Sequence, residues 1–251
     1  MKKLNKRIWP IIIWIILWEV LSIVVGKDIL LTGPLKTVKC ALFILKTPVY
    51  WHSIFFTFAR IGYGFFLAVI AGILFAILAT HYGYIKEFLA PFVFTIKTIP
   101  VASFIILVLI WFSSRSLSIV ISFLMGFPII YTNMLEGISQ RNIKMQELAR
   151  VFKIPALRRI RYIDLGELLP YFTAGCKVAS GLCWKAGIAA EVIGMPPRSI
   201  GEQLQQAKVY LDTPNLFAWT LIIIGISLLF EKVVIFIITR LFEKIGKVSR
   251  L

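Results

Sequence analysis

Long runs of apolar residues divide the chain, and most of them are about as long as a helix that crosses a membrane. Such a helix needs about 20 apolar residues, because its backbone hydrogen bonds must be satisfied within the helix where there is no water. The runs of this kind are 8–26, 54–79, 99–112, 117–136, 172–193 and 215–239. The pattern therefore predicts an all-α polytopic membrane protein with about six transmembrane helices.

The third run is shorter than the others, and the residues before it contain prolines. Lys97 stands between Pro91 and Pro100 in this stretch. Proline interrupts a helix because it lacks an N–H group and its ring clashes with the preceding turn. We therefore expect a broken or interfacial segment here rather than a clean crossing.

Composition supports lipid as the solvent for most of the chain. Of its 251 residues, 59% are hydrophobic and only 16% are charged, and the mean hydropathy is +0.87. The net charge of +16 would suit a nucleic-acid-binding protein, but the basic residues lie between the apolar runs and at both ends. Membrane proteins carry their cytoplasmic positive charge in this way. We therefore expect no nucleic-acid partner.

The distribution of Lys and Arg also predicts an orientation. Four basic residues precede the first run, and the connection 137–170 and the C-terminal tail are also rich in them. By the positive-inside rule these segments and both termini are expected in the cytoplasm, with the chain in the plasma or inner membrane. The first run lacks a small-residue cleavage site and contains three tryptophans, so we interpret it as a retained span. The extramembrane segments are too short to fold alone, which predicts one membrane domain over residues 1–251.

The connection 137–170 contains a helical pattern of its own. Apolar residues in its first half recur at spacings of three and four, and these are Met145, Leu148, Val151 and Phe152. Apolar residues in its second half, after Pro155, recur at threes, and these are Leu157, Ile160 and Ile163. The spacing predicts two short amphipathic helices at the cytoplasmic surface, with a bend at Ile154 and Pro155.

Two interpretations of this segment remain open from the pattern alone. A basic amphipathic helix can lie on anionic lipid headgroups. Alternatively, its apolar and basic side chains can insert into a groove of a partner protein.

Residues in and beyond this segment resemble a known family. The matching residues are Gln146-Glu147-Leu148-Ala149-Arg150, Leu169-Pro170, Gly175, Ala179, Gly181, Trp184 and Ala190-Glu191. They are similar to the cytoplasmic signature of binding-protein-dependent ABC importer permeases, in particular the sulfonate, taurine, nitrate and bicarbonate group, which also includes permeases for thiamine precursors and riboflavin. Further matches lie outside the signature, at Thr57, Arg60, Gly64-Phe65, Gly72, Pro91, Ile99-Pro100, Trp111-Phe112 and Leu211-Asp212-Thr213.

The resemblance implies a type I importer permease that forms the translocation path for a small solute. In that family the cytoplasmic connection docks on a separate ABC ATPase, two ATPases act on two permeases, here expected as a homodimer, and an extracytoplasmic binding protein delivers the solute. The expected ATPase-coupling residues are Glu147, Leu148, Ala149, Arg150, Val151, Phe152, Lys153, Pro155, Arg158 and Arg161. The identity of the solute is not readable from the sequence.

The energy source is expected in another polypeptide. The sequence contains no GxxxxGK[ST] phosphate loop, because Gly246-Lys247 lacks both the upstream glycine and the following Ser or Thr. We therefore expect no enzyme activity, no catalytic residue and no cofactor in this chain, with ATP and Mg²⁺ bound by the partner. The scattered cysteines and histidines predict no metal site.

One residue departs from the family pattern. The family has a glycine about six residues after the signature glutamate, and Lys153 stands at that position. A lysine pays a steric cost at positive φ that glycine does not. We therefore expect Pro155, rather than Lys153, to make the bend.

Charged groups inside the predicted fifth span are candidates for the translocation path. Ionisable groups in a membrane are costly and often functional. Trp184, Lys185 and Glu191 are therefore expected to line the path or its gate, with Trp184 as a bulky plug. The alternative is that the two charged side chains reach water from the ends of the span or pair with a neighbouring helix.

Two other classes of membrane protein account for less of the sequence. A secondary transporter driven by an ion gradient is expected to show repeated halves, and no repeat is visible. A membrane-embedded enzyme needs a cluster of catalytic side chains, and the 12 acidic residues are scattered. The permease interpretation accounts for more of the sequence than either.

Overall fold

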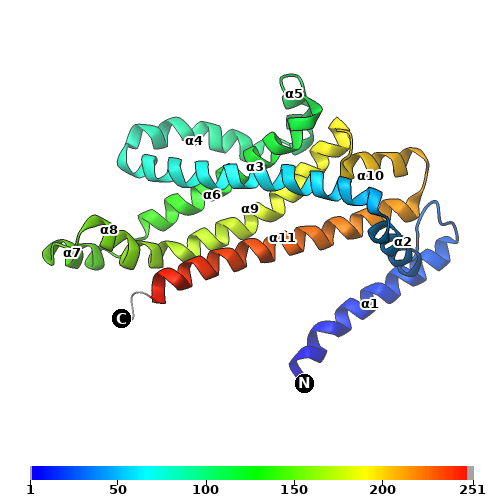
Figure 1. Cartoon of the computed structure of the whole chain (residues 1–251), viewed down its shortest axis with the longest axis horizontal. Helices are drawn as coiled ribbons and strands as arrows, with labels where there is room; N and C mark the ends of the chain where they lie inside the picture. Colours follow the sequence, from blue (N-terminus) through cyan, green and yellow to red (C-terminus); the bar gives the residue numbers. More distant parts are fainter. Residues whose placement is uncertain (1, 248–251) are drawn as a thin grey trace.

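The computed structural model describes residues 2–247, and every regular element in that range is a helix (Figure 1). The elements are α1 Lys2–Val25, α2 Pro34–Lys46, α3 Pro48–His81, α4 Gly83–Thr98, α5 Val101–Leu109, α6 Ser114–Ser139, α7 Ile143–Val151, α8 Ala156–Arg159, the π-helical turn η1 Ile160–Asp164, α9 Leu165–Gly194, α10 Ile200–Val209 and α11 Thr213–Lys247. The predicted all-α class is confirmed.

Each predicted span falls on a helix, but length and composition support fewer than six crossings. Among the described residues, α3, α6 and residues 213–242 of α11 are long and apolar enough to cross a membrane. The bent pair α4–α5 would make a fourth span if it crosses as one unit. The apolar part of α1, Trp9–Val25, is shorter. Within 172–193, α9 carries three charged residues and falls outside this set.

The third predicted span is broken, as the prolines indicate. Helix α4 ends at Thr98, helix α5 begins at Val101, and their axes differ by 109°. Pro91 lies inside α4 without ending it, whereas Pro100 precedes the first residue of α5. The sequence did not predict α4 as a helix, and Figure 1 shows it running back alongside α3.

The core forms where α3, α6 and α9 pack against one another with very small residues at the contacts. A Cβ atom on Gly64 of α3 would lie 2.4 Å from the Ile119 carbonyl oxygen of α6, and one on Gly187 of α9 would lie 2.7 Å from Ile61 and Ser122. Small residues let membrane helices approach closely in this way. Gly181 has no atom within 4 Å of such a Cβ, so it faces away from the bundle.

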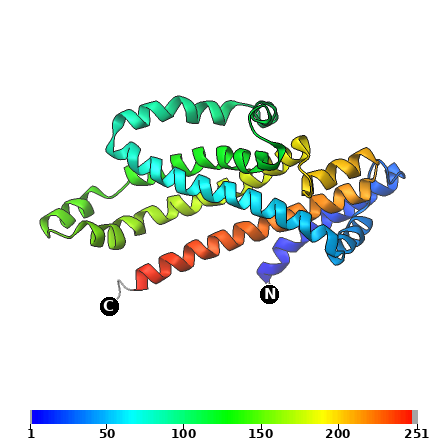
Figure 2. The same ribbon diagram turned by 45° about the horizontal axis from the view of Figure 1, so that its top comes forward.

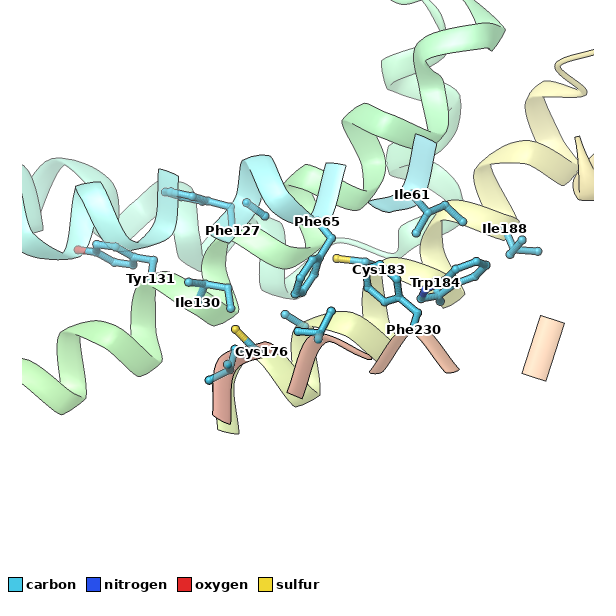
Figure 3. Packing of buried hydrophobic residues seen from close by; sticks show 14 of the residues in the cluster. Ile61, Phe65, Phe127, Ile130, Tyr131, Cys176, Cys183, Trp184, Ile188 and Phe230 are labelled. Atoms are coloured by element: carbon cyan, nitrogen blue, oxygen red, sulfur yellow. The ribbon is translucent and has the colours of Figure 1, made fainter. Parts of the chain in front are cut away.

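Aromatic side chains fill the space where α11 closes on this core. Phe230 of α11 lies 5.3 Å from Phe65, 5.6 Å from Phe58 and 5.9 Å from Trp184, measured between ring centroids. Figure 3 shows Trp184 beside Phe230 and Cys183 within the cluster. These contacts hold α3, α9 and α11 together.

The N-terminal region attaches to the bundle mainly through α2, and α1 adds one aromatic contact, between Trp18 and Phe217 of α11. Most described side chains of α1 are exposed, including Trp14 at 67%, and in Figures 1 and 2 the N-terminal part of this helix leaves the bundle. The Cys40 thiol of α2 donates to Asn215 Oδ1 of α11, at 3.0 Å. Burial and nearby Asp212 raise the pKa of that thiol. Cys40 is therefore a structural contact.

The molecule has two distinct ends. Helices α7 and α8 lie together at one end, near the C-terminus of α11, and we call this the α7 end (Figure 1). Helices α2 and α10 lie at the opposite end, which we call the α10 end, and Figure 2 shows the same separation. Helix α10 begins at a capped end, because the Ser199 side chain accepts a hydrogen bond from the backbone N–H of Glu202.

Candidate functional site: the α7 segment and a buried polar network

Helix α7 begins at a well-formed cap. The Asn142 side-chain oxygen accepts hydrogen bonds from the backbone N–H groups of Lys144 and Met145, at 3.0 and 3.4 Å. The backbone N–H of Asn142 donates to the Glu167 carboxylate of α9, at 3.2 Å. A capping side chain satisfies amide groups that the first turn of a helix leaves free. The start of α7 is thereby fixed relative to α9.

Helix α7 ends in a Schellman motif. The N–H of Ile154 donates to the Ala149 carbonyl at 2.9 Å, and the N–H of Lys153 donates to the Arg150 carbonyl at 3.0 Å. In this motif the residue between the helix and the closing amide takes a left-handed conformation, usually as glycine. Lys153 has that conformation, with φ of 49°. The expectation that Pro155 makes the bend is wrong, because Lys153 itself supplies it.

The second short helix is not separate from the next span. Helix α8 covers only Ala156–Arg159, and the chain continues through η1 into α9, with αR backbone at Arg159, Asp164 and Leu165. The structure thus corrects the expected pair of helices to one short helix, α7, followed by an extension of α9. A π-helical turn of this kind inserts an extra residue into a helix and is frequent at functional sites.

Asp164 ties these pieces together. Its side chain is buried and accepts a hydrogen bond from Gln146 Nε2 of α7, at 2.7 Å. Arg141 and Arg159 lie 3.5 and 3.6 Å from its two carboxylate oxygens. Because Arg141 precedes α7 and Arg159 ends α8, one carboxylate holds the segment on both sides of the bend.

The apolar face predicted for α7, formed by Met145, Leu148, Val151 and Phe152, is exposed, with Met145 the least exposed at 40%, and the neighbouring Ile143 is exposed as well. We define the α7 face as Ile143, Leu148, Val151 and Phe152, whose exposed fractions are 72%, 48%, 77% and 70%. Nine of the ten expected coupling residues are exposed, and only Ala149 is buried, at 2%. The anchoring contacts therefore leave the face uncovered and use Ala149 as a packing residue.

The three expected path residues do not meet. Trp184 is 2% exposed and belongs to the aromatic core, and Lys185, the next residue, is exposed on another side of α9. Glu191 is fully buried near the α10 end. The structure therefore places one of these residues in the core, one on an open helix face and one in a polar network.

That polar network joins α3, α9 and α10. Thr57 Oγ1 of α3 donates to Glu191 Oε2 at 2.7 Å, and it accepts from the backbone N–H of Ile200 at 2.9 Å. The N–H of Gly201 also donates to Glu191, at 3.4 Å. A Cβ atom on Gly201 would lie 2.4 Å from the Glu191 carbonyl carbon, so only glycine allows this approach. The carboxylate thus accepts from the first turn of α10, where helix amides favour negative charge.

Arg60 lies next to the network but makes no hydrogen bond to Glu191. Its Nη1 atom lies 3.9 Å from Glu191 Oε1, and both atoms are buried and make no hydrogen bond. Sequence reasoning noticed Thr57, Arg60 and Glu191 separately as positions of family resemblance. It missed their contact, because 134 residues separate Thr57 from Glu191. It also missed Gly201, because the close approach of this residue to Glu191 depends on how α10 packs on α9.

Comparison with known proteins decides the family. Residues 68–245, from the middle of α3 to the last turns of α11, match the family described as binding-protein-dependent transport system inner membrane component. The chain belongs to this family. The suspected resemblance is confirmed, and the family consists of transport components rather than enzymes.

Individual members of the family are distant relatives. The chain is 27% identical to an aliphatic sulfonates transport permease protein of Bacillus subtilis, over 65% of this chain and 59% of that protein. It is 26% identical to a nitrate import permease protein of Synechococcus elongatus, over 72% of this chain and 68% of that one. A formylaminopyrimidine transport permease protein of Halalkalibacterium halodurans is 23% identical over 87% of this chain and 88% of that protein. Their different solutes leave the solute of this chain undetermined.

Proposed function

We propose that this chain is the membrane-spanning permease subunit of an ATP-driven uptake transporter, and that the α7 face docks on a separate ATPase. The observation that carries the proposal is the α7 face itself. Four large apolar side chains stand exposed on a helix that is capped at its start, closed at its end and anchored to α9 through Asp164. An apolar helix face held in a fixed position suits insertion into a groove of a partner.

The length of the preceding helix supports a position of α7 outside the hydrocarbon. Helix α6 has 26 residues, which corresponds to about 39 Å at 1.5 Å per residue. The hydrocarbon core of a bilayer is about 30 Å thick. Since α7 begins only after α6 has ended, its face is reached from water or from a protein partner more readily than from lipid tails.

Basic residues favour the cytoplasm for this end. Arg150, Lys153, Arg158 and Arg161 are exposed on or beside α7, and the positive-inside rule assigns such clusters to the cytoplasmic side. With α7 inside, the α10 end lies outside, where the binding protein is expected. ATP and Mg²⁺ then belong to the partner ATPase.

The open side of α9 supports a second copy of the permease. Exposed residues repeat along one side of this helix, at Ala174, Lys177, Val178, Gly181, Leu182 and Lys185. No carboxylate lies within ion-pair distance of either lysine among the side chains that the structure describes. Lysines facing lipid are costly, so we propose that this side faces a second copy across a water-filled path. Lys185 remains a proposed path residue.

A matched pair of substitutions tests the docking role. Val151 and Val209 each end a short helix, and they are 77% and 68% exposed at opposite ends of the molecule. Val151→Asp is expected to reduce copurification with the co-expressed ATPase at least tenfold, because burying a carboxylate in an apolar groove is costly. Val209→Asp is expected to leave copurification unchanged. Equal copurification of both variants and the parent chain would contradict the proposal.

A further inference from the structure

Three arginines from separate elements converge on a cavity at the α10 end. The cavity has a volume of about 440 Å³ and is lined by Phe56, Arg60, Arg115, Pro197 and Arg198. Phe56 and Arg60 belong to α3, Arg115 to the first turn of α6, and Pro197 and Arg198 to the loop before α10. Positive charges that line one cavity repel each other, and a bound anion would relieve that repulsion.

The protein supplies little compensating charge. Among the side chains that the structure describes, Arg115 and Arg198 make no ion pair. Arg60 faces Glu191 across 3.9 Å without a hydrogen bond. That carboxylate is already bonded to Thr57 and to the backbone of Gly201. The cavity therefore keeps an excess of positive charge and unused guanidinium donors.

The conformation of the loop supports a built arrangement. Arg198 has φ of 59°, a left-handed conformation that is unfavourable for a residue with a side chain. Its backbone N–H donates to the Glu202 carboxylate at 2.6 Å, which fixes this conformation. The Glu202 carboxylate thus accepts a hydrogen bond from the Arg198 backbone and makes no ion pair with its side chain, which lines the cavity.

We propose that this cavity binds a small organic oxyanion, a sulfonate or a carboxylate. Planar guanidinium groups donate paired hydrogen bonds to such anions, and Phe56 and Pro197 supply apolar walls for a short carbon chain. The cavity is a site in the permease itself, distinct from any site in a separate binding protein. The assignment of the anion as the transported solute rests on the proposed function, whereas anion binding by the isolated chain does not.

The binding measurements use the purified chain without ATPase or binding protein. Ethanesulfonate is the probe, and ethanesulfonamide, which has nearly the same shape and no charge, is its control. Isothermal titration calorimetry in maltoside detergent is expected to detect ethanesulfonate and not ethanesulfonamide. Arg115→Gln and Arg198→Gln are each expected to weaken binding about tenfold or more, because each removes a charged hydrogen-bond donor.

A charge-matched variant separates a site from general attraction. Lys39→Gln removes one exposed positive charge from α2 at the same end, and it is expected to change the affinity less than about twofold. Equal effects of all three variants, equal binding of the sulfonamide, or no binding of ethanesulfonate would overturn the proposal.

Two further outcomes would assign the arginines to another partner. If ethanesulfonate binds in maltoside but not in phosphatidylglycerol nanodiscs, lipid phosphates occupy the cavity and the proposal fails. It also fails if Arg115→Gln abolishes capture of the binding protein while ethanesulfonate affinity is unchanged. Because none of these measurements involves the ATPase, they can fail while docking of α7 stands, and the reverse is equally true.

Discussion

The same local motif ends α7 and α10, which lie at opposite ends of the molecule. Ala149-Arg150-Val151-Phe152-Lys153 ends α7, and Ala207-Lys208-Val209-Tyr210-Leu211 ends α10. In both, the alanine is buried and its carbonyl accepts the closing hydrogen bond, and the fifth residue has positive φ, 49° at Lys153 and 55° at Leu211. The hydrogen bonds of the motif thus enforce a conformation that neither side chain favours.

Substitution at Lys153 tests this cost. Lys153→Gly is expected to slow hydrogen exchange at the Ile154 amide about fivefold, because left-handed backbone costs an ordinary residue about 1 kcal/mol or more. Lys153→Val is expected to speed exchange, because a β-branched side chain tolerates positive φ least. Exchange that is insensitive to both changes would show that residue 153 does not adopt this conformation.

Residue Gly201 must also be a glycine, because α10 and α9 approach each other there. Gly201→Ala would place a Cβ against the Glu191 backbone and force α10 away from α9. We expect a loss of about 2–3 kcal/mol and a fall in Tm of roughly 5–10 °C in detergent. Gly225→Ala is the control, since a Cβ there meets no atom within 4 Å, and its Tm should stay level or rise. A Gly201→Ala protein as stable as that control would contradict the packing described for α10.

At the scale of elements, the contacts of the Asp164 carboxylate hold α7 against the start of α9. Asp164→Ala removes the acceptor of Gln146 and the partner of Arg141 and Arg159. A cost of about 1–3 kcal/mol is expected, because buried polar groups lose their partners. The measurement is trypsin cleavage at the exposed Lys153, which should become several-fold faster.

An exposed ion pair provides the control for that measurement. Asp28→Ala removes the ion-pair partner of Lys36 at the α10 end of the molecule, where both side chains are more than half exposed. Exposed pairs contribute little to stability, so cleavage at Lys153 should not change. Equal cleavage of the Asp164→Ala, Asp28→Ala and parent proteins would mean that Asp164 does not anchor α7.

The sequence predicted the elements whose signal is local. The apolar runs predict a helix at every expected span, and the spacing of Met145, Leu148, Val151 and Phe152 predicts α7 and its apolar face. The sequence does not predict α4, because a proline usually interrupts a helix, whereas α4 continues through Pro91. Steric preference alone predicts the bend at Pro155, but the hydrogen bonds to the Ala149 and Arg150 carbonyls hold Lys153 in the left-handed conformation.

The contacts of the candidate sites depend on packing between distant segments and were not readable. Trp184 and Lys185 are adjacent in sequence, yet one lies in the aromatic core and the other on the open side of α9. Which direction each side chain takes depends on where α3 and α11 cover α9. The contact between Thr57 and Glu191 likewise depends on how α3 and α9 meet.

At the scale of the whole molecule, the two ends have different chemistry. The α7 end presents an exposed apolar face with basic residues around it, and the α10 end presents a cavity lined by arginines. Helices α3, α6, α9 and α11 connect the two ends through a close-packed core (Figure 1). A close-packed core has low compressibility and transmits displacement, so a movement of α7 is expected to reach α10 through α9.

The central claim is that a separate ATPase subunit binds the α7 face. The most direct measurement is cross-linking in native membranes, with a photoreactive residue in place of Phe152 and, as a matched control, in place of Tyr210, the corresponding exposed aromatic residue of α10. We predict a cross-link to the ATPase subunit from position 152 and none from position 210. Cross-links from position 152 to lipid alone, in an assembly that contains the ATPase, would contradict the account.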